Sequence, residues 1–274
     1  MSFGVITHRS FVNSWECDEN VHLNVQFYWK RFGQASRIFQ HGESLKPQHW
    51  ASRHVRYHAE LGMSENTTIR SASVMDTNKI VHHLYAAGGD ILSATAVDDY
   101  SDLIGTTNVE IDTVPEAALP RSLPNDSLPI VGTQKMLDQQ NGILSHLSAI
   151  DRNECGEDGV LLDENHISRF SDAAGHFWHH LGINRAWMQK QNLGSVAVEM
   201  KVTRHMLPKT NMITEIISWI DQINDKTFSF RHQVKDRMSG NVLYSGGVTA
   251  LMMDITTRKA VVLPDMFREK ISGN

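Results

Sequence analysis

Residues 4–41 of this chain are repeated at residues 142–179, with a constant offset of 138 and no gap. Twelve of these thirty-eight positions are identical, where average residue usage gives roughly two. The identical pairs include Glu16/Glu154, Cys17/Cys155, Arg31/Arg169, Phe32/Phe170 and Ala35/Ala173. A repeat of this kind predicts one fold used twice, and 274 residues are enough for two domains of ordinary size.

The two copies differ most where polar side chains gather in the first. The first copy has Asp18, His22 and Asn24, and the second has Gly156, Val160 and Leu162 at the same positions. The second copy therefore shows which residues the fold needs, and the first holds the side chains that remain for chemistry.

Hydrophobic periodicity predicts the same order of elements in both copies: a strand, a long helix and four further strands. In the first copy the helix follows Asn24, a good N-cap, and ends near Gly42. Its apolar stripe consists of Val25, Tyr28, Phe32, Ala35 and Phe39. The expected strands are residues 4–13, 52–60, 67–75, 79–87 and 91–100, and then residues 142–151, 196–204, 212–221, 226–236 and 242–254. These elements predict an α+β fold in which one long helix is wrapped by a curled antiparallel sheet, made twice.

A proline-rich stretch separates the copies. Four of the seven prolines lie between residues 115 and 129, which predicts an ordered-to-loose linker. The expected organisation is therefore a first domain at 1–112, a linker at 113–138 and a second domain at 139–274. Beyond the helices we expect the copies to correspond at an offset of 145, pairing Ser73 with Ser218.

Composition indicates a soluble globular protein, with 41% hydrophobic and 21% charged residues. A net charge of −5 and the lack of any Lys/Arg-rich run indicate that the chain has no basic surface for binding nucleic acid. The N-terminal residues do not resemble a signal peptide, and no run of eighteen apolar residues predicts a membrane span. We expect a cytoplasmic protein whose two cysteines are free thiols.

The polar cluster lies directly before the first predicted helix, where unpaired amides and the positive end of the helix dipole are exposed. A substrate carbonyl placed there would be polarised by the amides of Val25 and Gln26. Asp18 could then serve as general base on water or as nucleophile, with His22 and Asn24 orienting the water or the carbonyl. Asn20 could hold the carboxylate in place. This equipment suits acyl transfer to water and calls for no metal and no cofactor.

The spacing Asp18-x-Asn20-x-His22-x-Asn24 before a helix that carries Tyr28 resembles the signature of hotdog-fold thioesterases. It is similar to the Asp-x-x-Gly-His-x-Asn form of acyl-CoA thioesterases, although Val21 replaces the glycine. It is closer to the form in acyl-acyl-carrier-protein thioesterases, which are fused double hotdogs that keep the motif in their second half. The resemblance implies a tandem hotdog that hydrolyses an acyl thioester, with acyl-CoA favoured over acyl-carrier protein. It also implies Asp18 as base or nucleophile and the other three side chains as positioning groups, and pseudo-dimers that could assemble further.

Two other functions compete with this hypothesis. Hotdog enoyl-CoA hydratases or dehydratases carry the motif Asp-x-Asn-Pro-x-His. In this sequence the histidine lies one residue earlier and no proline is present. A non-catalytic acyl-CoA-binding hotdog would not need the retained polar cluster. Arg53, Arg56 and Arg70 are candidates for binding coenzyme A phosphates, with solvated sheet edges as the alternative. Paired histidines such as His54 and His58 lack the third ligand of a metal site, so no metal is expected.

Overall fold

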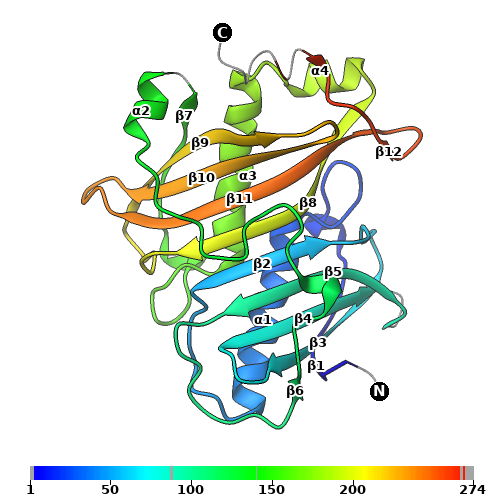
Figure 1. Ribbon diagram of the computed structural model, residues 1–274, viewed down its shortest axis with the longest axis vertical. Helices are drawn as coiled ribbons and strands as arrows, with labels where there is room; N and C mark the ends of the chain where they lie inside the picture. The colour runs from blue at the N-terminus through cyan, green and yellow to red at the C-terminus, as the bar shows by residue number, and fades with distance from the viewer. Residues whose placement is uncertain (1–2, 87–88, 140, 266–267, 269–274) are drawn as a thin grey trace. The chain divides into compact units, whose positions relative to one another are not determined.

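The computed structural model describes residues 3–86, 89–139, 141–265 and 268, and it divides the chain into two compact units (Figure 1). The first unit consists of Met1–Arg121 with Leu162–Ile167, and the second of Ser122–Leu161 with Ser168–Asn274. The domain limits expected from the sequence, 1–112, 113–138 and 139–274, stay a prediction.

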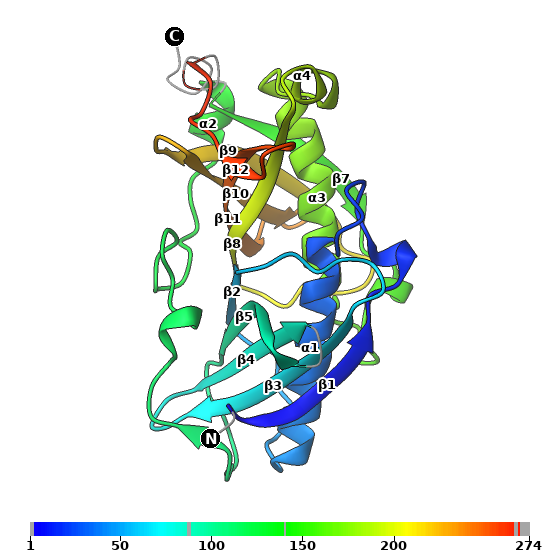
Figure 2. The ribbon, with the colours of Figure 1, turned by 90° about the vertical axis from the view of Figure 1, so that its right-hand side faces the viewer.

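The first unit is a long helix on a five-stranded antiparallel sheet. α1 (Val25–Gly42) packs against β1, β3 and β4, along one face of the sheet (Figure 2). The strands follow one another in space in the order β1-β3-β4-β5-β2, and β6 (Glu110–Ile111) pairs in parallel with β3. The five strands are β1 (Val5–Phe11), β2 (Ser52–Tyr57), β3 (Asn66–Val74), β4 (Lys79–Ala86) and β5 (Ile91–Asp99).

The helix forms where its sequence predicts it. The Asn24 side chain accepts a hydrogen bond from the Gln26 N–H, so Asn24 is the N-cap, and the helix runs to Gly42. Its buried residues recur every three or four positions, which turns one face onto the sheet. They include Tyr28, Phe32, Ala35 and Phe39. The predicted end of β4 at Ala87 lies outside the described residues.

The second unit repeats this plan. Its strands follow the order β7-β9-β10-β11-β8, which is the order of the first unit strand for strand, and β12 (Lys259–Ala260) extends β11. Gly246 on β11 leaves room for the Phe170 ring, since a Cβ there would come within 2.2 Å of it. No helix of the described residues combines the length and apolar character needed to cross a bilayer. The elements are α2 (Gln134–Asp138), β7 (Gly142–Ala149), α3 (Asp163–His180), α4 (Arg185–Lys190), β8 (Leu193–Arg204), β9 (Ile213–Ile223), β10 (Thr227–Asp236) and β11 (Val242–Asp254).

Matching hydrogen bonds fix how the two copies correspond beyond their helices. Val12 N–H donates to Glu65 O in the first unit, and Ile150 N–H donates to Met212 O in the second, both within 2.9 Å. Since residue 12 corresponds to residue 150, residue 65 corresponds to residue 212, an offset of 147. The expected offset of 145 was wrong, because the loop before this strand is two residues longer in the second copy than that alignment allowed.

The proline-rich segment is packed rather than loose. In the second unit, side chains that alternate along β8 bind its backbone: Glu199 accepts the N–H groups of Ser122 and Leu123 at 2.9 and 3.2 Å. Lys201 Nζ donates to the carbonyls of residues 124, 125 and 126 at 2.6–3.0 Å. In the first unit, Arg56 donates to the carbonyls of Glu116 and Leu119. The expected linker at 113–138 is therefore held over the sheets by polar side chains that are themselves largely covered.

Replacing Lys201 by methionine should lower the free energy of unfolding by about 2–4 kcal/mol, because three carbonyl oxygens lose a charged donor inside the protein. Urea denaturation measures this change. The exposed Lys226→Met variant is the matched control and should stay within about 0.5 kcal/mol of the parent. Equal stability of both variants would show that the segment does not depend on this ammonium group.

Candidate active site

Asp18 lies at the start of a tight loop that returns the chain to α1. Asp18 N–H donates to His22 O at 2.8 Å, and Val21 N–H donates to Asp18 O at 3.1 Å. The exposed carboxylate turns back on the loop, where its Oδ1 accepts the N–H groups of Asn20 at 2.8 Å and His22 at 3.1 Å. Two main-chain donors therefore orient one carboxylate oxygen.

Asn20 holds the Asp18 carboxylate through its main chain. Its main-chain N–H donates to Asp18 Oδ1, whereas its side-chain amide takes part in no hydrogen bond with the described residues. A positioning role for the Asn20 side chain stays a prediction. A main-chain donor at that position is available to any residue, so the sequence motif alone could not show it.

The amide groups at the start of α1 are not equivalent. The Gln26 N–H donates to Asn24 Oδ1 at 3.1 Å, so the helix cap already engages it. The Val25 N–H faces no acceptor among the described residues. The expected pair of carbonyl-polarising amides therefore narrows to Val25, supported by the positive end of the helix dipole.

His22 has a carboxylate partner that the sequence pattern did not identify. Its Nδ1 lies 3.6 Å from Glu60 Oε1, and both side chains are partly exposed. At the offset of 147, Glu60 corresponds to Leu207, while His22 corresponds to Val160. Both members of the pair are thus apolar in the second copy. Glu60 lies beyond residues 4–41, where the offset of 138 applies. Only an alignment at the offset of 147 shows that its counterpart is the apolar Leu207.

Tyr28 is linked to the Asp18 loop through Leu61. Its hydroxyl accepts the Leu61 N–H at 3.2 Å, and Leu61 O in turn accepts the Leu23 N–H at 2.7 Å. Burial raises the pKa of the Tyr28 hydroxyl well above its ordinary value. Tyr28 therefore stays protonated and fixes the backbone that faces His22.

Val21 adopts a backbone conformation that β-branched residues avoid. Its φ is +64°, and the equivalent Gly159 in the second unit has φ +73°. The left-handed region costs an L-residue about 1–2 kcal/mol, and glycine adopts it freely. The loop geometry is therefore the same in both units, and the first unit maintains it with a strained valine.

The three arginines expected to bind phosphates already have partners. Arg53 is wholly buried and binds Asp98 through Nε and Nη2 and Asp163 through Nη1, at 2.5–2.6 Å. Burial alone would raise the pKa of Asp98, but the Arg53 guanidinium outweighs it and lowers that pKa to about 2. The expectation for Arg53 was wrong, since its charge is neutralised inside the first unit.

Arg56 and Arg70 are partly accessible and donate to main-chain carbonyls. Arg56 binds the carbonyls of Glu116 and Leu119, and Arg70 binds those of Phe3 and Gly4. A role for Arg56 and Arg70 in binding coenzyme A stays a prediction.

A second cluster, a chain of hydrogen-bonded side chains inside the first unit, has the composition of a serine-hydrolase triad. Ser71 Oγ lies 2.6 Å from His82 Nδ1, and His82 Nε2 lies 3.3 Å from Asp98 Oδ2. All three residues are wholly buried. The second unit keeps the Ser218–His232 contact at 2.6 Å, and burial lowers the pKa of His232 to about 3. The serine–histidine pair thus belongs to the fold.

The aspartate of that chain is present in the first unit alone. Strand register places Val248 where the first unit has Asp98, and Met200 where it has Arg53. The second copy therefore lacks both Arg53 and Asp98, just as it lacks both His22 and Glu60.

The remaining sequence expectations concern thiols and histidines. Cys17 and Cys155 are free, as expected, and burial raises the pKa of each. Across the described residues, no group of three or more His, Cys, Asp or Glu side chains has the arrangement to hold a metal ion. His54 is buried and His58 is exposed.

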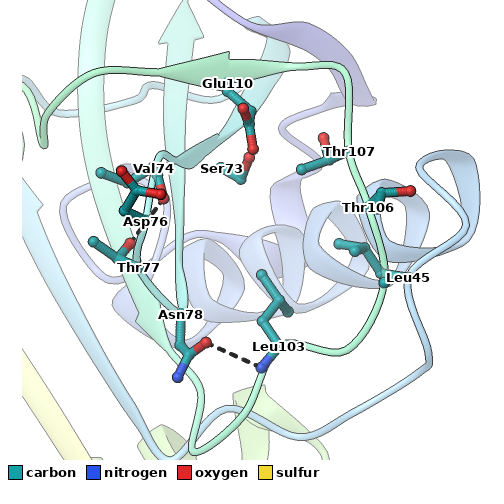
Figure 3. A pocket seen from close by; sticks show the side chains of 11 residues that line it. Leu45, Ser73, Val74, Asp76, Thr77, Asn78, Leu103, Thr106, Thr107 and Glu110 are labelled. Atoms are coloured by element: carbon teal, nitrogen blue, oxygen red, sulfur yellow. Dashed lines mark hydrogen bonds between the residues drawn. The ribbon is translucent and has the colours of Figure 1, made fainter.

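A polar cavity of about 360 Å³ lies at the other end of α1 (Figure 3). Leu45, just beyond the helix, lines it together with Asp76 and Glu110, and Asn78 accepts the Leu103 N–H at its edge. The Asp18 loop precedes α1 and Leu45 follows it, and this eighteen-residue helix is roughly 27 Å long. The lining contains no histidine and none of the motif residues, so the cavity is separate from the candidate site.

A sequence comparison identifies the family of the second half. The profile of the thioesterase-like superfamily matches residues 152–271. Residues 152–271 are therefore similar to the thioesterase-like superfamily. No curated protein matches the chain in a sequence search.

Solved structures with a similar fold cover most of the chain. A Lactobacillus plantarum protein, provisionally titled an oleoyl thioesterase, matches with a TM-score of 0.64 and 9% identity, covering 90% of this chain and 96% of its own. An acyl-ACP thioesterase from Bacteroides thetaiotaomicron matches with a TM-score of 0.59 and 8% identity, covering 89% and 96%. At these identities the likeness establishes a hotdog-like fold and leaves the substrate open.

A reciprocal exchange of Val21 and Gly159 tests the backbone strain in the loop. Val21→Gly should leave the free energy of unfolding unchanged or raise it by up to about 1 kcal/mol, because relief of strain offsets the extra entropy of glycine. Gly159→Val should lower it by about 1–2 kcal/mol, since a Cβ there meets its nearest atom at an ordinary 3.7 Å and backbone strain alone acts. Thermal and urea unfolding of both variants give the comparison. A loss of stability in Val21→Gly together with a gain in Gly159→Val would contradict the assigned strain.

Proposed function

We propose that this protein is a tandem double hotdog that hydrolyses an acyl thioester at the Asp18 loop, with acyl-CoA as the favoured substrate over acyl-carrier protein. The observation that carries the proposal is the Asp18 carboxylate, held by the N–H groups of Asn20 and His22 beside the start of α1. The superfamily match of the second half and the fold of the whole chain support the same reaction class.

The chemistry needs a base, a polarised carbonyl and a water molecule. Asp18 accepts a proton from water, and the hydroxide adds to the thioester carbonyl. The Val25 N–H and the helix dipole stabilise the oxyanion that develops. Collapse of the tetrahedral intermediate breaks the C–S bond, and the thiolate takes up the proton, which leaves a free acid and a thiol. Asp18 could instead attack the carbonyl directly and form an anhydride that water then opens.

The paired residues His22 and Glu60 have a positioning role in this proposal. Glu60 holds the imidazole, and the imidazole and the Asn24 side chain orient the water or the carbonyl. The second copy carries Val160, Leu207 and Leu162 at these positions, so it cannot repeat this arrangement. The first copy is therefore the one that we assign to catalysis. A cytoplasmic location and assembly of the protein into oligomers stay predictions.

Asp18→Asn should reduce thiol release from acyl-CoA at least a hundredfold, because the amide keeps the loop's hydrogen bonds but cannot accept the proton. Thiol release is followed with a chromogenic disulfide reagent across several chain lengths, with crotonyl-CoA hydration and an acyl-carrier-protein substrate in parallel. Asp158→Asn is the matched control, since Asp158 Oδ1 accepts the Val160 N–H at 3.0 Å in the equivalent loop. Unchanged release in Asp18→Asn would remove Asp18 from the mechanism.

Single-turnover hydrolysis in water labelled with oxygen-18 separates the two roles of Asp18. If Asp18 is the nucleophile and water opens the anhydride at the Asp18 carbonyl, the label enters the Asp18 side chain, whereas a general base leaves all the label in the released acid. Mass spectrometry of the peptide that contains Asp18 gives the answer.

Glu60→Gln should lower kcat about tenfold or more with little change in KM, because the loss of the carboxylate charge frees the imidazole to leave its reactive orientation. Steady-state kinetics on the same acyl-CoA measures both constants. Glu110→Gln, an exposed carboxylate at the far end of the first unit, should leave both unchanged. An equal loss in the two variants, or a change in KM alone, would argue against positioning by Glu60.

A further inference from the structure

Four large apolar side chains are exposed around the Asp18 loop. We call them the apolar rim, and their exposed fractions are 45% for Phe11, 77% for Trp15, 51% for Val21 and 46% for Met63. Single exposed apolar residues are common on protein surfaces and need no explanation. Four of them on neighbouring segments, next to a cluster of reactive groups, are unusual.

Backbone hydrogen bonds join the segments that carry the rim. Val12 N–H donates to Glu65 O, and Ser64 N–H donates to Val12 O, both at 2.9 Å, so the segment that ends β1 lies beside residues 64 and 65. Met63 N–H donates to Val21 O at 3.3 Å, which attaches the same segment to the Asp18 loop. Trp15 lies in the single helical turn between β1 and that loop.

The second unit builds the same backbone without these side chains. Equivalent hydrogen bonds join Ile150 to Asn211 and Met212, and Thr210 N–H to Gly159 O at 3.0 Å. The residues that correspond to the rim are Ala149, Asn153, Gly159 and Thr210. The fold therefore does not need a large apolar side chain at any of the four positions, and the rim occurs only in the copy that carries the reactive groups.

Val21 adds an energetic argument. The loop holds Val21 in a left-handed backbone conformation in which its Cβ causes strain, and Gly159 adopts the same conformation without strain. The side chain is half exposed, so packing within the protein does not explain why valine is kept. A contact made when the site is occupied would explain it.

We propose that the apolar rim binds the acyl chain of the thioester, which makes the protein selective for long aliphatic chains over short ones. This inference rests on the proposed function for the position of the thioester carbonyl. The nearby exposed carboxylates of Asp18, Glu19 and Glu60 repel phosphate groups, so the rim suits a hydrocarbon chain better than the phosphates of coenzyme A or an anionic lipid surface. Each methylene that the rim removes from water strengthens binding about fourfold.

The test uses binding without hydrolysis. Dodecyl-CoA and butyl-CoA thioethers, which lack the carbonyl, are titrated into the full-length protein by calorimetry. The wild type should bind the dodecyl compound at least tenfold more tightly than the butyl compound. A variant that carries the second-copy residues, Phe11→Ala, Trp15→Asn, Val21→Gly and Met63→Thr, should bind both alike. The control variant replaces exposed apolar residues of the second unit, Leu144→Ala, Leu147→Ala and Met238→Thr, and should keep the preference.

The outcomes separate this proposal from the proposed function. Equal binding of the two thioethers by the wild type, or an undiminished preference in the rim variant, overturns the rim. A rim-dependent association with neutral phosphatidylcholine vesicles, or a rim-dependent change of mass in sedimentation, also overturns the rim if the rim variant keeps the wild type's preference for the dodecyl compound. A rim-dependent preference without thiol release from dodecanoyl-CoA supports the rim and overturns the hydrolysis. Thiol release at a rate that ignores chain length, together with equal thioether binding, overturns the rim alone.

Discussion

A buried ion pair, Glu16 with Arg31, ties together the elements that place the candidate site. Arg31 Nη2 lies 2.8 Å from Glu16 Oε2 and also donates to Phe11 O, while its Nε donates to Ser10 Oγ. Burial by itself raises the pKa of Glu16, but the hydrogen bonds from Arg31 and Asn13 outweigh it and lower that pKa below its ordinary value. One guanidinium on α1 therefore fixes the end of β1 and the turn that starts the Asp18 loop. The second unit repeats the pair as Glu154 with Arg169.

Three charged pairs of the first unit, Glu16–Arg31, His22–Glu60 and Arg53–Asp98, are each kept or lost as a pair in the second copy. His22 with Glu60, and Arg53 with Asp98, are both replaced by apolar pairs in the second copy. The physical reason is clearest for Arg53 and Asp98: a buried charge without its partner is strongly destabilising, whereas an apolar pair in the same place is tolerated. The Glu16–Arg31 pair survives in both copies because the loop depends on it in both.

The sequence predicted well what depends on local pattern. The helix that starts after Asn24 and buries Tyr28 and Phe32, and the free thiols, follow from periodicity, capping and composition. It predicted poorly what depends on contacts across the fold. Arg53 looked available because its partners lie 45 and 110 residues away, and Glu60 had no motif of its own. Composition predicted an ordered-to-loose linker for the proline-rich stretch, but it does not report that side chains from β8, such as Lys201, donate hydrogen bonds to that backbone.

The position of Asp163 has a consequence for how the protein could be divided. This residue belongs to the second repeat in sequence, yet it lies in the first compact unit, where it binds Arg53 and accepts the Trp50 indole N–H. A chain cut between the repeats would leave the first fragment with a buried guanidinium that has lost one of its two carboxylates. Such a fragment should therefore be less stable than the first unit of the intact chain, because a buried charge that loses a partner is destabilising.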